Sequence, residues 1–210
     1  MCKIGQMSLD YDQAQAAIVA AAREIHARGW VPATSGNFSV RLGDGDVAIT
    51  ASGKDKSQLG EADILRVDLS GKAHEGGTAS AELPLHLQLY RRNARIGAIL
   101  HTHSVNATIV SLENPQGLRF EGLELLKAFA GVTTHDTALV IPVFANSQDI
   151  PALASEVEEY MQDNQQGSAY LIQGHGMYTW GADIDECMRH LEALEFLLEY
   201  HRLRTGGTEQ

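Results

Sequence analysis

Hydrophobic residues recur along the chain with two different periods, and these periods divide it into helices and strands. The apolar positions of residues 10–28 fall three or four apart, which is the spacing of one face of a helix. They are Ile18, Ala21, Ala22 and Ile25. Gly29 follows as a C-terminal cap, since glycine readily adopts the conformation that ends many helices. Further helices are predicted over 80–92, 121–130, 149–162 and 183–203.

Short apolar runs lie between these helices and predict strands. They cover 37–42, 46–50, 64–69, 96–103, 138–144 and 169–173. A Gly-Asp-Gly turn joins the first two runs and predicts a hairpin. The order of elements lacks the regular strand–helix alternation of a parallel sheet. We therefore expect an α/β fold in which helices cover a mixed, largely antiparallel sheet.

Length and composition favour one globular domain over 1–210. Hydrophobic residues make up 44% of the 210 positions and charged residues 20%, which suits a chain with its own core rather than a disordered one. No linker or repeat divides the sequence. The ends, about 1–9 and 205–210, are predicted to be flexible.

The net charge and the apolar runs of the sequence exclude some classes of binding partner. A net charge of −11 repels phosphate backbones, so nucleic acid is not expected as a partner. No apolar run approaches the ~18 residues of a membrane span, and the two cysteines, Cys2 and Cys187, form no Cys-x-x-Cys pair. These features predict a cytoplasmic protein with reduced thiols that contacts no membrane. Local backbone N–H groups can still bind a small anion.

Two histidines end an apolar run and are the first candidates for chemistry. Residues two apart in a strand point to the same face, so His101 and His103 project their rings side by side. His175 follows another predicted strand between Gly174 and Gly176, where the backbone can approach a neighbouring segment closely. Three imidazoles with one open position are typical of a catalytic zinc ion. Histidines that merely end two strands would show the same pattern, so the spacing leaves both interpretations open.

Five motifs stand in the order seen in the class II aldolase family, which the chain resembles over roughly residues 10–200. They are TSGNFSVR at 34–41, TASGKDK at 50–56, SAELPLH at 80–86, HTHS at 101–104 and QGHGMYTWG at 173–181. The resemblance implies a three-layer α/β/α fold and an enzyme of small phosphorylated sugars. It also implies a homotetramer and one zinc ion per subunit, bound by His101, His103 and His175.

The segment EGLELLKAF at 121–129 resembles the dehydratase branch of that family. This resemblance implies the removal of water from 5-methylthioribulose 1-phosphate, giving 5-methylthio-2,3-dioxopentyl phosphate in methionine salvage. Glu124 would be the acid/base and Lys127 a substrate contact. The leucines beside Glu124 indicate partial burial, which would keep the pKa of its carboxyl group near the working pH.

The resemblance also implies a phosphate cradle made of small, polar residues with converging N–H groups. Its members are Gly36, Asn37, Ser52 and Gly53. Lys54 and Ser80 are further candidate contacts, although Ser80 is also well placed to cap the helix that follows it.

Glu82 keeps two other interpretations open. In the aldolase branch of the family a glutamate at this place transfers the proton, so Glu82 is a second candidate for the acid/base and supports retro-aldol cleavage of a ketose 1-phosphate. Glu82 and His86 are also four apart on the predicted helix, a spacing at which the two side chains can simply pair with each other. A non-catalytic, adducin-like binding module is a third interpretation of the chain, and it predicts the loss of metal ligands.

Overall fold

The computed structural model describes residues 9–164 and 167–206, and most of the two ends predicted to be flexible lies outside these residues. The helices are α1 (Tyr11–Ala27), α2 (Leu83–Arg92), α3 (Val105–Glu113), α4 (Ile150–Asp163) and α5 (Ile184–Gly206), with the 3-10 helices η1 (Glu61–Asp63) and η2 (Glu124–Ala128). The strands are β1 (Asn37–Arg41), β2 (Val47–Thr50), β3 (Ile64–Val67), β4 (Ala98–Thr102), β5 (Leu118–Glu121), β6 (Ala138–Ile141), β7 (Val143–Phe144), β8 (Ala169–Ile172) and β9 (Gly176–Gly181).

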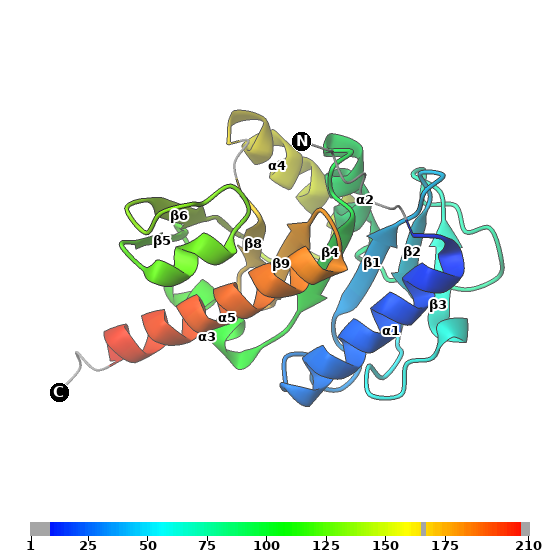
Figure 1. Cartoon of the computed structure of the whole chain (residues 1–210), viewed down its shortest axis with the longest axis horizontal. Helices are drawn as coiled ribbons and strands as arrows, with labels where there is room; N and C mark the ends of the chain where they lie inside the picture. Colours follow the sequence, from blue (N-terminus) through cyan, green and yellow to red (C-terminus); the bar gives the residue numbers. More distant parts are fainter. Residues whose placement is uncertain (1–8, 165–166, 207–210) are drawn as a thin grey trace.

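Seven strands form the central sheet, in the order β3-β2-β1-β4-β9-β8-β7 (Figure 1). Every neighbouring pair is antiparallel except β7 and β8, which are parallel. The predicted mixed, largely antiparallel sheet is therefore confirmed. A separate pair, β5 and β6, lies outside it.

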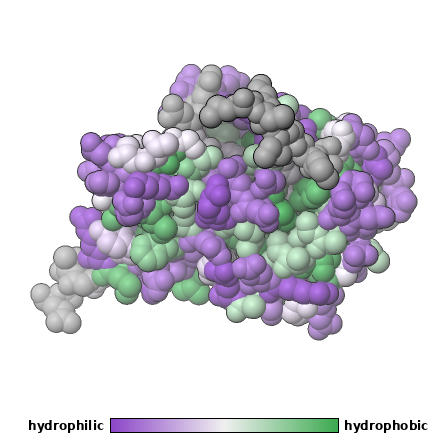
Figure 2. Space-filling view, viewed as in Figure 1, coloured by the Kyte–Doolittle hydropathy of each residue, from purple (hydrophilic) through white to green (hydrophobic). Residues whose placement is uncertain are grey.

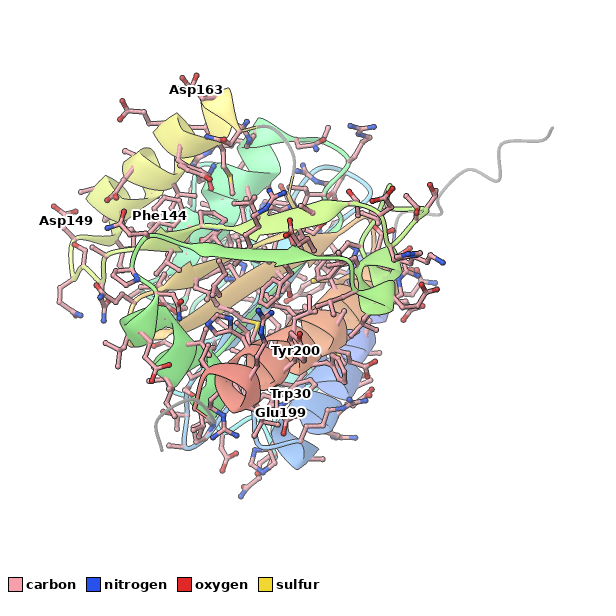
Figure 3. The ribbon with its side chains drawn as sticks, turned by 90° about the vertical axis from the view of Figure 1, so that its left-hand side faces the viewer. Trp30, Phe144, Asp149, Asp163, Glu199 and Tyr200 are labelled. Atoms are coloured by element: carbon pink, nitrogen blue, oxygen red, sulfur yellow. The ribbon has the colours of Figure 1, made fainter. Side chains whose placement is uncertain are left out.

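Helices cover both faces of the sheet and give the three layers (Figure 3). Helices α1, α3 and α5 pack with the β5–β6 pair over one face, where Phe38 and Leu100 belong to the apolar core. Helices α2 and α4 cover the other face, where Ile49 and Ile99 belong to a second core. Side chains alternate between these cores along each strand, so successive residues of β4 point to opposite layers.

The structure differs from the predicted elements in the region after β4. Residues 105–113 form α3 although valine, threonine and isoleucine in this segment favour strands. The Ser104 hydroxyl stabilises the first turn of α3, because it accepts a hydrogen bond from the Ala107 N–H at 3.0 Å. β5 is a further element that the sequence pattern does not predict, and the predicted helix over 121–130 is only the short 3-10 helix η2. The predicted strand 138–144 is split at Pro142 into β6 and β7, which pair with different strands.

The face of the molecule seen in Figure 2 is largely polar. Figure 2 shows hydrophilic side chains over much of one face, with apolar patches between them. None of the helices in the described part of the chain has the length and apolarity that crossing a membrane requires.

Candidate metal centre

The first two candidate ligands come from β4 and the residue just after it. His101 is fully buried and points toward the layer of α2, on the same face of the strand as Ile99. Its Nδ1–H donates a hydrogen bond to the Met177 carbonyl at 2.9 Å. With the Nδ1–H in this hydrogen bond, a neutral ring has its lone pair on Nε2, which is the arrangement in which a histidine binds metal. The Nε2 atom of His103 lies 2.8 Å from that of His101.

The turn between β8 and β9 brings His175 to the same place. Its ring centroid lies 5.1 Å from that of His101 and 4.5 Å from that of His103. Both neighbouring glycines are needed for this approach. Gly174 has φ +63°, a conformation that side chains disfavour, and a Cβ atom on Gly176 would lie 2.1 Å from the Thr102 carbonyl oxygen. The glycines thus allow the turn to lie against the end of β4.

Replacing Gly176 by alanine is expected to destabilise the protein and to weaken metal binding. The new methyl group would displace the turn from β4, which costs roughly 1–3 kcal/mol of unfolding free energy by comparison with other overpacked sites. Urea unfolding measures the first effect and metal titration the second. Gly76→Ala is the matched control, since a methyl group on Gly76 would meet no other atom within 4 Å and should be tolerated. Equal stability of the two variants would contradict this account.

Glu82 completes the cluster from the start of α2, in the layer toward which His101 points. It is the residue before α2, and its carboxylate oxygens lie 3.1 Å from His101 Nε2 and 3.2 Å from His175 Nε2. The ligand atoms of Glu82, His101, His103 and His175 all lie within 4.8 Å of one another. The structure therefore brings the predicted histidine triad together and adds Glu82, whose place beside all three rings the sequence does not reveal. The alternative pairing of Glu82 with His86 is not found, because Asn37 lies between them.

Burial and charge make this cluster suitable for a divalent cation. Burial lowers the pKa of His103 to about 3 and also lowers the pKa of His175, so both rings are neutral and keep free lone pairs. Burial by itself would raise the pKa of Glu82, but His101 and the hydrogen bond from Asn37 outweigh it and hold that pKa well below its usual range. A divalent cation between His101 Nε2 and the carboxylate would supply positive charge at the same place and could be bound by both groups.

Part of the predicted phosphate cradle borders this cluster. The Asn37 amide donates to Glu82 Oε2 at 2.6 Å and to Ser80 Oγ at 3.2 Å. Ser80 also accepts from the Glu82 N–H at 3.2 Å, so its hydroxyl stabilises the turn before α2. Gly36 has φ +76°, and a Cβ atom there would lie 2.7 Å from the His101 carbonyl oxygen, so only glycine fits between β1 and β4.

The rest of the predicted cradle lies on an exposed turn after β2. Gly53 has φ +70° and open space around it. The Ser52 N–H already donates to the Thr78 carbonyl at 3.0 Å, and Lys54 forms an ion pair of 2.7 Å with Asp63. An anion would have to compete with these two contacts, and the roles of Ser52, Gly53 and Lys54 stay predictions.

Lys56 is a residue that the sequence reasoning missed. Its side chain is 1% exposed, and its Nζ donates to the carbonyls of Thr34 and Lys54 at 3.1 and 2.7 Å. Lys56 thus joins the turns that carry the TSGN and ASGK motifs. Burial lowers the pKa of this lysine to about 8. Lys56 is the third charged residue of the run Lys-Asp-Lys, and such a run normally lies on the surface. Its place in the TASGKDK motif is the only signal in the sequence that could have pointed to it.

Glu124 does not belong to the cluster of candidate metal ligands. The side chain of Glu124 is 74% exposed and pairs with Lys127 at 2.6 Å and with His135 at 3.5 Å. The expected burial of Glu124 is therefore wrong within one chain, because η2 turns Leu126 inward and the glutamate outward. The hydrogen bond from Lys127 lowers the pKa of Glu124 rather than raising it.

Comparisons with known proteins agree with these features. The sequence profile of the class II aldolase and adducin N-terminal domain matches residues 16–201. A methylthioribulose-1-phosphate dehydratase of Marinobacter nauticus is 50% identical over 192 residues, which cover 90% of this chain and 92% of the relative. One of Sorangium cellulosum is 46% identical over 206 residues, covering 96% and 97%. An L-fuculose 1-phosphate aldolase structure superposes with a TM-score of 0.80 at 22% identity, covering 98% of this chain and 92% of that chain, which shows a shared fold.

Proposed function

Since the chain belongs to the class II aldolase and adducin family, we propose that it is a lyase that removes water from 5-methylthioribulose 1-phosphate in methionine salvage. The product is 5-methylthio-2,3-dioxopentyl phosphate. The observation that carries this proposal is the 50% identity to a dehydratase of that substrate over 90% of the chain. The cluster of three histidines supports this proposal. The same cluster disfavours the adducin-like binding module, which predicts the loss of metal ligands.

The chemistry requires a base, an acid and a site for negative charge. The hydrogen on C3 is acidic because it is α to the C2 ketone, and the hydroxyl on C4 leaves with a proton. The resulting enol becomes the 2,3-diketone when it is protonated on C4. A zinc ion held by His101, His103 and His175 would act as a Lewis acid that stabilises the charge left when C3 loses its proton.

We assign the proton transfers to Glu124 of a second copy of the chain. Within one chain Glu124 is exposed and lies outside the group of residues that includes the histidines, so it can serve only a site to which another subunit brings it. Lys127, which holds the Glu124 carboxylate, would accompany it and contact the substrate. The alternative base is Glu82, which lies inside the cluster of the same chain.

Assembly into a homotetramer is part of this proposal. Large apolar side chains of α3 and α5 are more than half exposed in the single chain, and a second subunit that covers them would bury apolar surface. They are Val105, Leu112, Phe196 and Leu203. Contacts through these helices would bring the adjacent η2 of one subunit to the surface of another. We further place the enzyme in the cytoplasm, where the buried thiol of Cys187 stays reduced.

The phosphate of the substrate would bind between the two turns that Lys56 joins. Gly36 and Gly53 let the backbone come close to an anion there, while Ser52, Lys54, Ser80 and the Asn37 backbone are the remaining candidate contacts. The Asn37 side chain is already committed to Glu82 and Ser80.

Incubating the pure, zinc-loaded protein with 5-methylthioribulose 1-phosphate is expected to give the diketone phosphate, which mass spectrometry detects as a loss of one water. The specific alternative is retro-aldol cleavage, favoured by the position of Glu82 beside the histidines. A panel of ketose 1-phosphates tests it, with release of dihydroxyacetone phosphate as the readout. Cleavage of a ketose without dehydration of 5-methylthioribulose 1-phosphate would overturn the proposed function.

A further inference from the structure

A chain of buried polar side chains leads from the metal centre into the core beneath α2. The residues lie on β1 and α2, and all are at most 5% exposed apart from the terminal carboxylate. The chain runs from Tyr90 through Ser39, His86 and Asn37 to Glu82. Successive contacts measure 2.8 Å, 2.7 Å, 2.5 Å and 2.6 Å. Buried polar side chains cost free energy unless all of them are hydrogen-bonded, whereas apolar side chains would not. We therefore expect this set of polar groups to have a role beyond packing.

The direction of every hydrogen bond in this series of side chains follows from the Glu82 carboxylate at its end. A carboxylate only accepts, so the Asn37 Nδ2 donates to Glu82 and its Oδ1 faces His86. Because an amide oxygen also only accepts, His86 carries its hydrogen on Nε2 and leaves Nδ1 as an acceptor for the Ser39 hydroxyl. Ser39 then accepts from the Tyr90 hydroxyl. Burial lowers the pKa of His86 to about 3, in agreement with this neutral form.

This directionality fixes the side of the Asn37 amide that faces the metal centre. If the amide turned over, its oxygen would meet the Glu82 carboxylate and its NH₂ group would meet the Nε2–H of His86. Both contacts would be repulsive, and His86 is held in place by Ser39 and by the ring of Tyr178, 5.6 Å away. The 2.6 Å hydrogen bond from Asn37 to Glu82 is also shorter than the contacts of that carboxylate with the histidine rings, at 3.1 and 3.2 Å.

We propose that His86 is a positioning residue, which orients the Asn37 amide and thereby holds the Glu82 carboxylate against the histidine ligands. The proposal rests on the metal centre of the proposed function but not on the identity of the substrate. The hydrogen bonds of His86 go to Ser39 and Asn37 rather than to a ligand histidine, so it acts on the centre through Asn37.

Metal affinity of three variants tests this role. His86→Leu keeps roughly the volume of the ring and removes both hydrogen bonds. Because His86 acts through Asn37, the expected loss of zinc affinity is about 10-fold, the lower end of the range for direct partners of ligands. His86→Gln retains an N–H that can reach Asn37, so it should bind zinc nearly as tightly as the parent protein. Tyr90→Phe is the matched control, because it removes one buried hydrogen bond at the far end of the chain and leaves Asn37 held.

Zinc affinity is measured by competition with a chromophoric chelator, and the unfolding transition in urea is measured in parallel. Loss of affinity in His86→Leu alone supports the proposal. Equal affinity in all three variants would overturn it, as would equal losses in His86→Leu and His86→Gln, since the ring would then serve only packing. If His86→Leu does not fold, Asn37→Ser carries the same test, because it removes the amide that touches Glu82.

These measurements need no substrate, so they stay informative if 5-methylthioribulose 1-phosphate is not the substrate. Where turnover is seen, the expected pattern is a lower kcat with little change in KM in His86→Leu, and unchanged constants in Tyr90→Phe. A change in KM alone would place the effect on phosphate binding instead and would contradict an effect of His86 that is transmitted through the position of Glu82.

Discussion

Glu124→Gln is expected to keep its metal and to lose about 10²–10⁴-fold in kcat, the usual contribution of a positioned acid or base. The amide is isosteric with the carboxylate but cannot take a proton from C3. Because Glu124 is 74% exposed in the single chain and pairs there with Lys127 and His135, the substitution should hardly affect stability. Steady-state kinetics together with elemental analysis of the same preparation measure both parts. Glu121→Gln, an exposed carboxylate three residues earlier, is the control and should remain active.

Mixing of two inactive variants tests whether Glu124 acts on a neighbouring subunit. One partner is Glu124→Gln and the other is His103→Ala, which lacks a metal ligand. If the site takes its glutamate from a second subunit, random reassembly of the two should restore about a quarter of the parent activity, because one site in four then has both intact residues. If each site belongs to one subunit, no site is complete and activity stays absent. Full activity of Glu124→Gln would instead assign the proton transfer to Glu82.

Removal of the metal is expected to abolish turnover, because no other group among the described residues of the cluster can stabilise the charge formed on the substrate. Dialysis against a chelator should give an inactive protein, and added zinc should restore the activity. Restoration by manganese or cobalt as well would show that the imidazole ligands accept several first-row ions. His103→Ala should behave as the chelated protein does and should not recover.

The matched control for that variant is His74→Ala. His74 lies on the surface and pairs with Asp46 at 2.9 Å, outside the cluster of candidate ligands. The His74→Ala variant should bind zinc and turn over normally.

Metal binding to the native state only should also raise the unfolding free energy, by about 2.7 kcal/mol at a zinc concentration 100 times the dissociation constant. Activity that survives complete removal of the metal would contradict the proposed chemistry.

The parts of the site that could be predicted from sequence are those set by local spacing. His101 and His103 are two residues apart at the end of a strand, and Gly174 and Gly176 flank His175, so neighbouring residues carry the signal. The central sheet and its largely antiparallel pairing follow from the same kind of short-range pattern. α3 does not, because its β-branched residues favour a strand and only its cap and packing make it helical.

The parts that could not be predicted depend on the three-dimensional surroundings of a residue. The spacing of Glu82 and His86 favours a direct pair, but Asn37 from β1, 45 residues before Glu82, separates the two side chains. The leucines beside Glu124 indicate burial, yet a 3-10 turn exposes the glutamate and buries Leu126 instead. Lys56 has the sequence context of a surface residue, while the fold places its ammonium group against the carbonyl of Thr34, 22 residues earlier.

The candidate ligands come from three segments of the chain, around 82, 101–103 and 175. The unfolded chain does not hold these segments together and offers no such site, so the free energy of binding an ion adds to the free energy of unfolding. The same ion would then stabilise the folded state and be required for turnover. A cell short of zinc would then hold fewer folded copies as well as fewer active ones, and its capacity to recycle the methylthio group would fall more steeply than the metal supply itself.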